Sequence, residues 1–142
     1  MAGSQSLKNH ARYVPLFHFV LTAMVLMNFI RTVLELRHFS EDALFAFMRG
    51  TAFVLMVWYI RAFPVAVQDR VIRLEMQLRV QKLAPELAER WDQLTIRQIV
   101  ALRFAGDGEL PALTREVLDG RLTAPSDIKQ RIQQWKPDLL RV

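Results

Sequence analysis

Eighteen consecutive residues between Arg12 and Arg31 contain no Asp, Glu, Lys or Arg; they read YVPLFHFVLTAMVLMNFI. As an α-helix they extend over roughly 27 Å, close to the bilayer's hydrocarbon thickness of about 30 Å. This stretch therefore predicts a membrane-spanning helix. A cleaved signal peptide is the alternative, because Lys8 and Arg12 resemble its charged start. The bulky residues that follow, MNFIRTVLELRHF, offer no small-residue cleavage site and favour an uncleaved span.

A second apolar segment follows a short polar connection. Residues 43–60 contain one charged residue, Arg49, and Ser40 or Asp42 can cap the start of a helix there. Taken alone, this segment also fits a buried helix of a soluble protein. Because about six polar residues join two apolar segments, the pair predicts an antiparallel hairpin. We expect a transmembrane helical hairpin over residues 13–63, with spans at about 13–35 and 43–62.

The basic residues on either side of the spans predict their orientation. Lys8 and Arg12 precede the first span, whereas the connection carries Arg37 alongside acidic residues. Five basic residues follow the second span: Arg61, Arg70, Arg73, Arg79 and Lys82. Because Lys and Arg collect on the cytoplasmic side, we expect both termini in the cytoplasm and residues 1–12 as a cytoplasmic tail.

Arg49 interrupts the second apolar segment about 9 Å inside its start. A hairpin folded about residues 38–40 brings it level with Asn28 and Arg31, and Glu35 lies one turn beyond Arg31. These four residues form a candidate intramembrane polar patch. Arg49 either extends its guanidinium to the interface or lines a polar path between protomers. A second span that begins at Gly50 would instead leave Arg49 at the membrane surface.

Residues 64–83 predict an amphipathic juxtamembrane helix, which Pro64 either opens or kinks. An apolar stripe recurs along it at helical spacing: Val67, Val71, Leu74 and Leu78. Ile72, Met76 and Leu83 lie beside this stripe and widen the apolar face. The candidate lipid-facing or partner-facing residues lie off the stripe's centre: Arg70, Arg73, Arg79 and Lys82. The stripe can cover the chain's own C-terminal domain, associate with itself or lie on anionic lipid. Acids such as Glu75 are interpreted as ordinary solvated helix charges.

Residues 84–142 predict a small all-α cytoplasmic domain of about four short helices. Thr95 and Gln98 have the spacing of a capping box, and Gly120 is expected to close a helix. The last helix is expected between Pro125 and Pro137, with Ile128, Ile132 and Trp135 on one face. About sixty residues are near the lower limit of independent stability. The domain is therefore expected to lean on the juxtamembrane helix or a second subunit.

No residue pattern for catalysis, cofactor binding or metal binding emerges from the sequence. There is no cysteine, and the predicted topology separates His10, His18 and His38. Phosphate-loop and nucleophile-elbow motifs are absent. The net charge is +5, of which residues 1–61 carry six basic minus three acidic residues and residues 62–142 carry thirteen minus eleven. A nearly balanced C-terminal half argues against a nucleic-acid surface.

Four stretches carry a resemblance to a known family: NHARYVP (9–15), VQDRVIRLEMQLR (67–79), LTIRQIVALRFAGDGELPAL (94–113) and IKQRIQQWKPDLLRV (128–142). They resemble an uncharacterised bacterial family of small two-span membrane proteins, classed as a domain of unknown function. The resemblance spans nearly the whole chain. It implies the bacterial cytoplasmic (inner) membrane and a cytoplasmic helical tail, and it supplies no activity or site residues.

These observations predict a non-enzymatic, membrane-anchored adaptor or accessory subunit that acts through protein–protein contacts of its helical domain. The alternative is a component of an oligomeric transporter or channel built around Arg49, Asn28 and Arg31. The expected partners are the lipid bilayer and a homo-oligomer or larger membrane complex, with no nucleic acid and no small-molecule substrate. No cofactor is expected.

Overall fold

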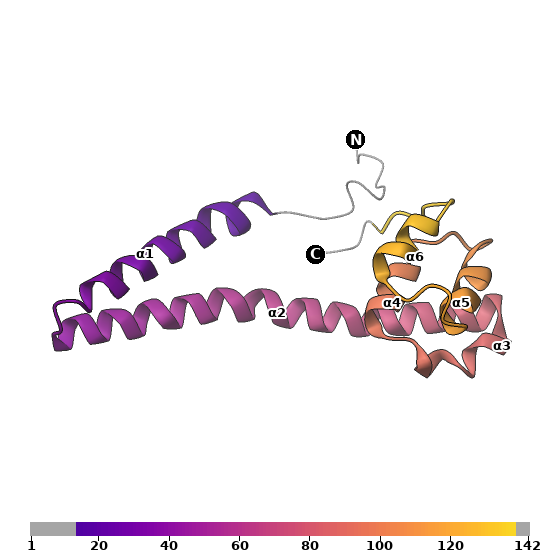
Figure 1. The fold of residues 1–142 in the computed structure, drawn as a ribbon, viewed down its shortest axis with the longest axis horizontal. Helices are drawn as coiled ribbons and strands as arrows, with labels where there is room; N and C mark the ends of the chain where they lie inside the picture. Colours follow the sequence, from indigo (N-terminus) through magenta and orange to yellow (C-terminus); the bar gives the residue numbers. More distant parts are fainter. Residues whose placement is uncertain (1–13, 139–142) are drawn as a thin grey trace. The chain divides into compact units, whose positions relative to one another are not determined.

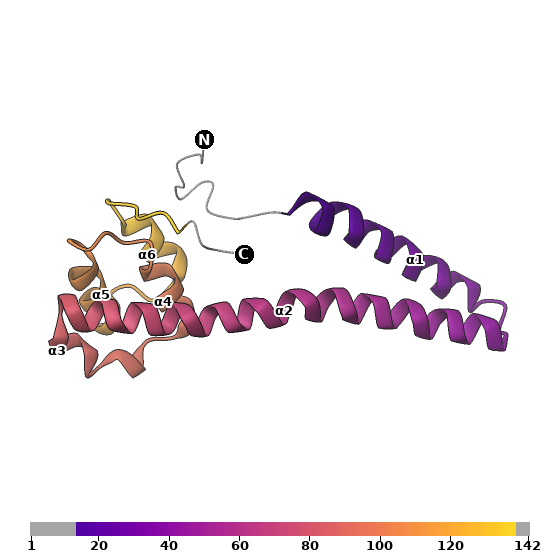
Figure 2. The same cartoon turned by 180° about the vertical axis from the view of Figure 1, so that it is seen from behind.

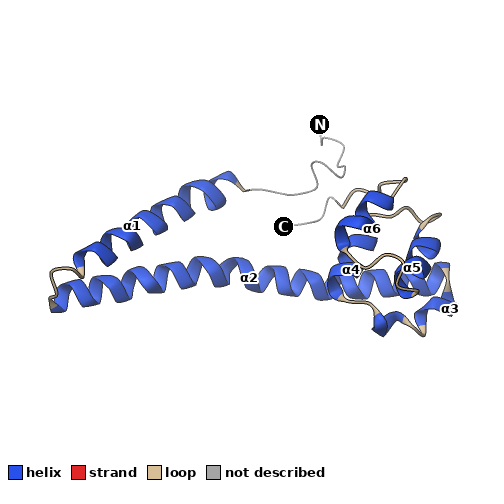
Figure 3. Ribbon diagram, viewed as in Figure 1, coloured by secondary structure: helices blue, strands red, loops and turns tan. Residues whose placement is uncertain are grey.

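The computed structural model describes residues 14–138, and this part of the chain is helical with no strand, as Figure 3 shows. The all-α class predicted from the sequence is confirmed. The described residues fall into two compact units that divide between Ala66 and Val67, so each unit is described by itself. The elements are η1 (Leu16–Leu21), α1 (Thr22–Glu35), α2 (Glu41–Leu83), α3 (Pro85–Ala88), η2 (Trp91–Gln93), α4 (Ile96–Leu102), α5 (Leu110–Leu118) and α6 (Pro125–Arg131). The predicted N-terminal tail, with Lys8 and Arg12, lies outside the described residues.

The first unit consists of η1, α1 and the N-terminal part of α2. One π-helical turn, η1, leads directly into α1, and the Thr22 hydroxyl at the junction donates to the carbonyl of Phe17 at 2.9 Å. Ser40 caps α2, because its hydroxyl oxygen accepts the backbone N–H of Ala43 at 3.1 Å. In both Figure 1 and Figure 2, α1 and this part of α2 run antiparallel and lie closest near the connecting turn.

Small side chains allow the close approach of α1 and α2 near that turn. Only Thr32, Ala43 and Gly50 are buried within residues 14–66. A Cβ atom on Gly50 would lie 2.8 Å from the Thr32 Oγ1 atom, so a larger residue at position 50 requires either the Thr32 side chain or the helices to shift. The rings of Phe29 and Phe47 meet beside this point with centroids 5.8 Å apart. Most of the remaining residues of the unit are exposed.

Pro64 lies inside α2 and does not end it. The idea that Pro64 opens a separate juxtamembrane helix is therefore wrong, because one helix runs from Glu41 to Leu83. Proline lacks the backbone N–H that would bond to the carbonyl four residues earlier, which leaves the carbonyl of Ile60 without its helical partner. The helix nevertheless continues and contributes residues to both units.

The second unit has a hydrophobic core of its own, to which the C-terminal part of α2 contributes. Ile72, Met76 and Val80 are 5%, 3% and 1% exposed, and they pack with residues of the short helices. In Figures 1 and 2, α4, α5 and α6 gather around this part of α2. The other largest fully buried side chains are Trp91, Phe104, Ile99, Leu102, Leu110, Ile128 and Thr114. The C-terminal part of α2 thus supplies apolar side chains to the core that the short helices form.

Local capping signals define the short helices. The Thr95 hydroxyl accepts the backbone N–H of Gln98, and the Gln98 side chain accepts the backbone N–H of Thr95 at 2.9 Å. The predicted capping box is confirmed. Gly120 follows α5 with φ of 74°, the left-handed conformation that glycine adopts without strain. Its predicted role in ending that helix is also confirmed.

The last helix is shorter than the sequence predicts. α6 ends at Arg131, because Ile132 is extended and the chain turns back toward α4. Glu109 supports this turn by accepting the backbone N–H groups of Gln133 and Gln134, both at 3.0 Å. Trp135 is therefore not on a helical face; it stacks on Phe104 with ring centroids 4.5 Å apart.

Candidate functional site

The four residues of the predicted polar patch do not form a single cluster in the first unit. Arg31 and Glu35 are one turn apart on α1 and form an ion pair, with Nε 2.9 Å from Oε1. Asn28 is exposed on the same helix, and its side chain makes no hydrogen bond to any residue between 14 and 138. Arg49 is exposed on α2, and its side chain likewise makes no hydrogen bond or ion pair in the described part of the chain.

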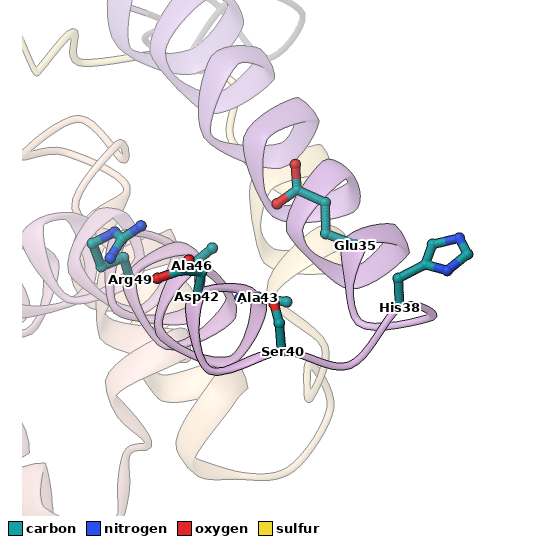
Figure 4. Close-up of a pocket in the computed structure, with 7 residues that line it drawn as sticks. All are labelled: Glu35, His38, Ser40, Asp42, Ala43, Ala46 and Arg49. Carbon is teal, nitrogen blue, oxygen red and sulfur yellow. Dashed lines mark hydrogen bonds between the residues drawn. The ribbon is translucent and has the colours of Figure 1, made fainter.

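Arg49 borders an open hollow of about 440 Å³ at the turn between α1 and α2. Figure 4 shows that Glu35 reaches this hollow from α1, whereas Asp42 and Arg49 reach it from α2. His38, in the connecting turn, points away from the other side chains. The hollow therefore combines one guanidinium with two carboxylates, and a bound anion would meet both signs of charge.

The four basic residues of α2 that were expected to face lipid or a partner also divide into two pairs. Arg73 and Arg79 bind the chain's own domain: Arg73 donates to Asp92 at 2.8 Å, and Arg79 donates to Asp107 at 2.6 Å. Arg70 and Lys82 are exposed, and within residues 14–138 neither makes a hydrogen bond or ion pair. Only Arg70 and Lys82 thus remain available to lipid or to a partner.

Arg79 joins α2 to the turn between α4 and α5. Its side chain is 16% exposed, and its guanidinium also donates to the carbonyls of Arg103 at 3.2 Å and Ala105 at 2.6 Å. The hydrogen bond from Arg79 holds the pKa of the Asp107 carboxyl below its ordinary value, and the Lys136 ammonium 3.5 Å away acts in the same direction. Most of the hydrogen-bond donors of Arg79 are therefore used inside the domain. We call Arg79, the Asp107 carboxylate and the carbonyls of Arg103 and Ala105 the clasp, because they fasten α2 to the turn.

A second hollow of about 260 Å³ lies beside this clasp, within the second unit. Arg79, Arg103 and Lys136 line it together with the carboxylates of Glu75 and Asp138. Arg103 is almost buried and forms an ion pair with Asp138 at 3.5 Å. The basic groups around the hollow are therefore engaged with acidic groups or carbonyls of the same domain.

The apolar stripe of α2 faces away from the core of the second unit. Val67, Val71, Leu74 and Leu78 are 61%, 47%, 62% and 67% exposed, whereas the residues of the opposite face are buried. The predicted apolar face is therefore divided: Ile72 and Met76, which were expected to widen the stripe, cover the C-terminal domain together with Val80. The four residues of the stripe itself do not. Among residues 14–138, no element covers the apolar face that the stripe forms.

Glu75 is a member of this surface that sequence reasoning missed. It was interpreted as an ordinary solvated charge, but it lies between the exposed stripe and the hollow beside Arg79, five residues after Arg70. Neither side chain forms an ion pair with a residue between 14 and 138. That spacing beside a 4-3-4 apolar repeat was the signal that could have identified it.

The described residues hold no group of three or more His, Cys, Asp or Glu side chains placed to bind a metal ion. Comparison with known proteins identifies a family. All of residues 1–142 match a family described as a family of unknown function, DUF6526. The chain belongs to this family. The resemblance seen in the sequence, to a domain of unknown function, is thereby confirmed. No curated protein and no solved structure matches the chain.

Proposed function

We propose that this member of the family is a non-enzymatic, membrane-anchored adaptor or accessory subunit. The hairpin of α1 and the N-terminal part of α2 anchors it, and the small helical domain makes contacts with proteins on the cytoplasmic face. The proposed location is the bacterial cytoplasmic membrane, with both termini on the cytoplasmic side. The transmembrane hairpin and the cytoplasmic bundle are parts of this proposal.

The outward-facing apolar surface of the first unit carries the proposal. Helix Leu16–Glu35 and helix Glu41–Leu83 are each long and apolar enough to cross a membrane. Within residues 14–66 only three residues are buried, although large apolar side chains such as Phe19, Met27 and Phe53 are 63%, 63% and 51% exposed. Water penalises such a surface at about 25 cal/mol per Å², whereas lipid tails do not.

The adaptor role is supported by how the second unit uses its charges. Arg73, Arg90 and Arg115 each pair with an acidic residue of the same unit, at 2.8, 3.3 and 3.0 Å. Such pairing favours a folded scaffold over a charged ligand site. The unit also leaves the apolar stripe of α2 exposed, and exposed apolar surface of this kind marks protein or membrane contacts.

Cysteine labelling tests the anchor and its orientation, because the chain has no cysteine of its own. We expect His38→Cys, in the turn, to react with a membrane-impermeant maleimide on intact spheroplasts. Arg97→Cys, exposed on α4, should react only after permeabilisation. Equal labelling of both positions, or release of the chain by alkaline carbonate, would rule out the proposed topology.

Native mass spectrometry of the detergent-extracted chain tests the adaptor role. The proposal expects a defined complex with a second copy or with another protein. A strict monomer that carries nothing with it would contradict an adaptor, whatever the outcome of the labelling.

The runner-up function is a transport or channel component. The observation that favours it is Arg49, which faces the open hollow with no hydrogen bond or ion pair in the described chain. Arg49→Leu should then abolish solute or ion flux in liposomes and leave assembly unchanged, whereas Arg37→Leu, exposed in the turn, should leave flux intact. Absence of any conductance for the unmodified chain would exclude this function.

A further inference from the structure

The exposed stripe of α2 has the spacing of a two-stranded coiled coil. Val67, Val71, Leu74 and Leu78 follow one another at intervals of four, three and four residues, which is the d-a-d-a order of a heptad repeat. β-branched Val at one a position and Leu at the following d position suit a pair of helices. All four side chains are at least 47% exposed.

The opposite side of α2 is already occupied in a single copy. Met76, at the f position, is 3% exposed and packs in the core of the second unit with Ile72 and Val80. The flanking Arg73 and Arg79 are tied to Asp92 and Asp107. The stripe therefore faces away from the domain, where a second helix meets no obstruction from these elements.

Charges beside the stripe fit a second copy of the same chain. In the heptad frame, Arg70 is at a g position and Glu75 at the following e position. These are the two positions that meet across a parallel coiled coil. Glu75 also borders the hollow beside Arg79, but its side chain is exposed and forms no ion pair within residues 14–138. A two-fold dimer would thus form two equal ion pairs, each from Arg70 of one copy to Glu75 of the other. In the same register Gln77 faces Lys82 of the other copy, without like-charge repulsion.

The antiparallel arrangement lacks this complementarity. Aligning the four apolar residues in opposite directions sets Arg70 against Gln77 and Glu75 against Gln68, so neither charge finds an opposite. A lipid surface also fits poorly, because Glu75 at the border of the stripe would face anionic headgroups. The pattern of flanking charge therefore selects one occupant and one direction.

We propose that α2 pairs in parallel with α2 of a second copy through Val67, Val71, Leu74 and Leu78, with Arg70 and Glu75 pairing reciprocally across the dimer. This inference rests on the proposed function in one respect, since insertion into one membrane in one orientation makes parallel helices the natural arrangement. The stripe covers fewer than two full heptads. Confinement of both copies to one membrane raises their effective concentration and compensates for this short length.

Disulfide crosslinking of the full chain in vesicles tests the pairing. In a parallel dimer the two copies of a d position are adjacent, so Leu74→Cys should form a disulfide-linked dimer under mild oxidation. The matched control is Arg97→Cys, which is exposed on α4 of the same unit and should stay monomeric. Because Leu74 is 62% exposed, this change should leave the fold intact, which circular dichroism checks.

Charge exchange tests the direction and the register. Arg70→Glu or Glu75→Arg alone should weaken dimerisation about tenfold, because two ion pairs each become repulsive. The double variant Arg70→Glu/Glu75→Arg should restore it, and Arg97→Glu should have no effect. If neither single exchange changes the stability of the dimer, the proposal is overturned. It is also overturned if the double variant dimerises as weakly as the single variants.

A nitroxide label on Leu74→Cys identifies what occupies the stripe. Dipolar broadening between labels supports a second copy. High accessibility to oxygen without broadening would place the stripe in lipid, and high accessibility to a water-soluble nickel chelate would place it in water. A label immobile in native membranes but mobile in vesicles of the purified chain would assign the stripe to another protein. Each of these three results overturns the proposal.

Alkaline carbonate extraction of the same vesicles keeps the two proposals separate. A chain that resists extraction but gives no crosslink at position 74 refutes the dimer and keeps the anchor. A chain that is released yet crosslinks at position 74 refutes the anchor and supports the dimer.

Discussion

Replacing Arg79 by methionine removes the clasp between α2 and the rest of the second unit while keeping an unbranched apolar side chain. The variant leaves the carbonyls of Arg103 and Ala105 without the guanidinium that now donates to them at 3.2 and 2.6 Å. Both residues are almost buried, with exposures of 9% and 0%. Hydrogen bonds from a charged donor contribute about 1.5–3 kcal/mol each. The adjoining hollow admits water that recovers part of this, so we expect a loss of about 2–4 kcal/mol in unfolding free energy.

The matched variant, Asp107→Asn, removes only the ion pair of this clasp. The Asp107 side chain is 57% exposed, and an exposed pair contributes about 0–1 kcal/mol. We therefore expect Arg79→Met to lose much more unfolding free energy than Asp107→Asn. Arg79→Lys should resemble the methionine variant, because a lysine ammonium cannot reach three acceptors in the planar arrangement of a guanidinium.

Urea unfolding of the full chain in detergent measures these differences. In a Trp58→Phe background the remaining tryptophans, Trp91 and Trp135, both lie in the second unit and report on its unfolding. If Asp107→Asn loses as much unfolding free energy as Arg79→Met, the ion pair contributes more than the hydrogen bonds to the two carbonyls. That result would refute the reasoning behind the predicted difference. Losses below about 0.5 kcal/mol for both variants, the range of ordinary surface substitutions, would refute the clasp itself.

The pH dependence gives the same clasp a second test. The folded-state pKa of Asp107 is lowered from 3.8 chiefly by its hydrogen bond to Arg79. A carboxyl with a lowered pKa stabilises the fold above its ordinary pKa, and this stabilisation is lost as the pH falls through the lowered value. Below about pH 4, the unmodified chain should therefore lose more stability than Asp107→Asn. Equal pH profiles would contradict the assignment.

Three further variants test other parts of the fold. Thr95→Ala removes the cap of α4 and should destabilise the second unit by about 1 kcal/mol in urea unfolding; no change would contradict the capping box. Gly50→Leu places a side chain where Thr32 Oγ1 lies 2.8 Å from a Cβ, so spin labels on α1 and α2 should report a longer distance; an unchanged distance would contradict the close approach. Trp135→Ala removes the 4.5 Å stack on Phe104 and should lower the unfolding free energy by about 2–4 kcal/mol; a smaller effect than that of the cap would contradict the stack.

Short-range signals were the predictable part of the fold. The cap at Thr95 depends on a residue three positions away, and the end of α5 depends on Gly120, which adopts a positive φ. Both were read correctly because all partners lie within one turn of helix. The all-α class follows from the same kind of local pattern, repeated along the chain.

Contacts between distant residues were not predictable from these local patterns. Arg79 and Asp107 are separated by 28 positions, and Glu109 reaches Gln134 across 25. The helical spacing of Ile132 and Trp135 suggested a longer last helix. The turn supported by Glu109 ends α6 at Arg131 instead, and Trp135 packs on Phe104 from an extended segment.

The periodicity of α2 could not decide which of its faces packs inside, because the helix is apolar on two sides. Ile72, Met76 and Val80 give one helical stripe, and Leu74 and Leu78 belong to another. Either set satisfies a hydrophobic pattern, and the predicted apolar face joined members of both sets, Ile72 and Met76 with Leu74 and Leu78. The structure separates them by exposure: the first set is at most 5% exposed, and the second at least 62%.

Charge distinguishes the two faces of α2 where apolar spacing does not. Basic residues at the edges of the inner face, Arg73 and Arg79, meet acids of the same domain. Arg70 beside the outer stripe meets none in the described chain, and the opposite charge at the matching heptad position is Glu75. A helix serving a single core would need only one ordered set of flanking charges. In α2, Arg73 and Arg79 pair with acidic residues of the same domain, whereas Arg70 and Glu75 have the spacing to pair with each other across a parallel dimer. This is the distribution of charge expected of a helix that packs in a domain and also in a dimer.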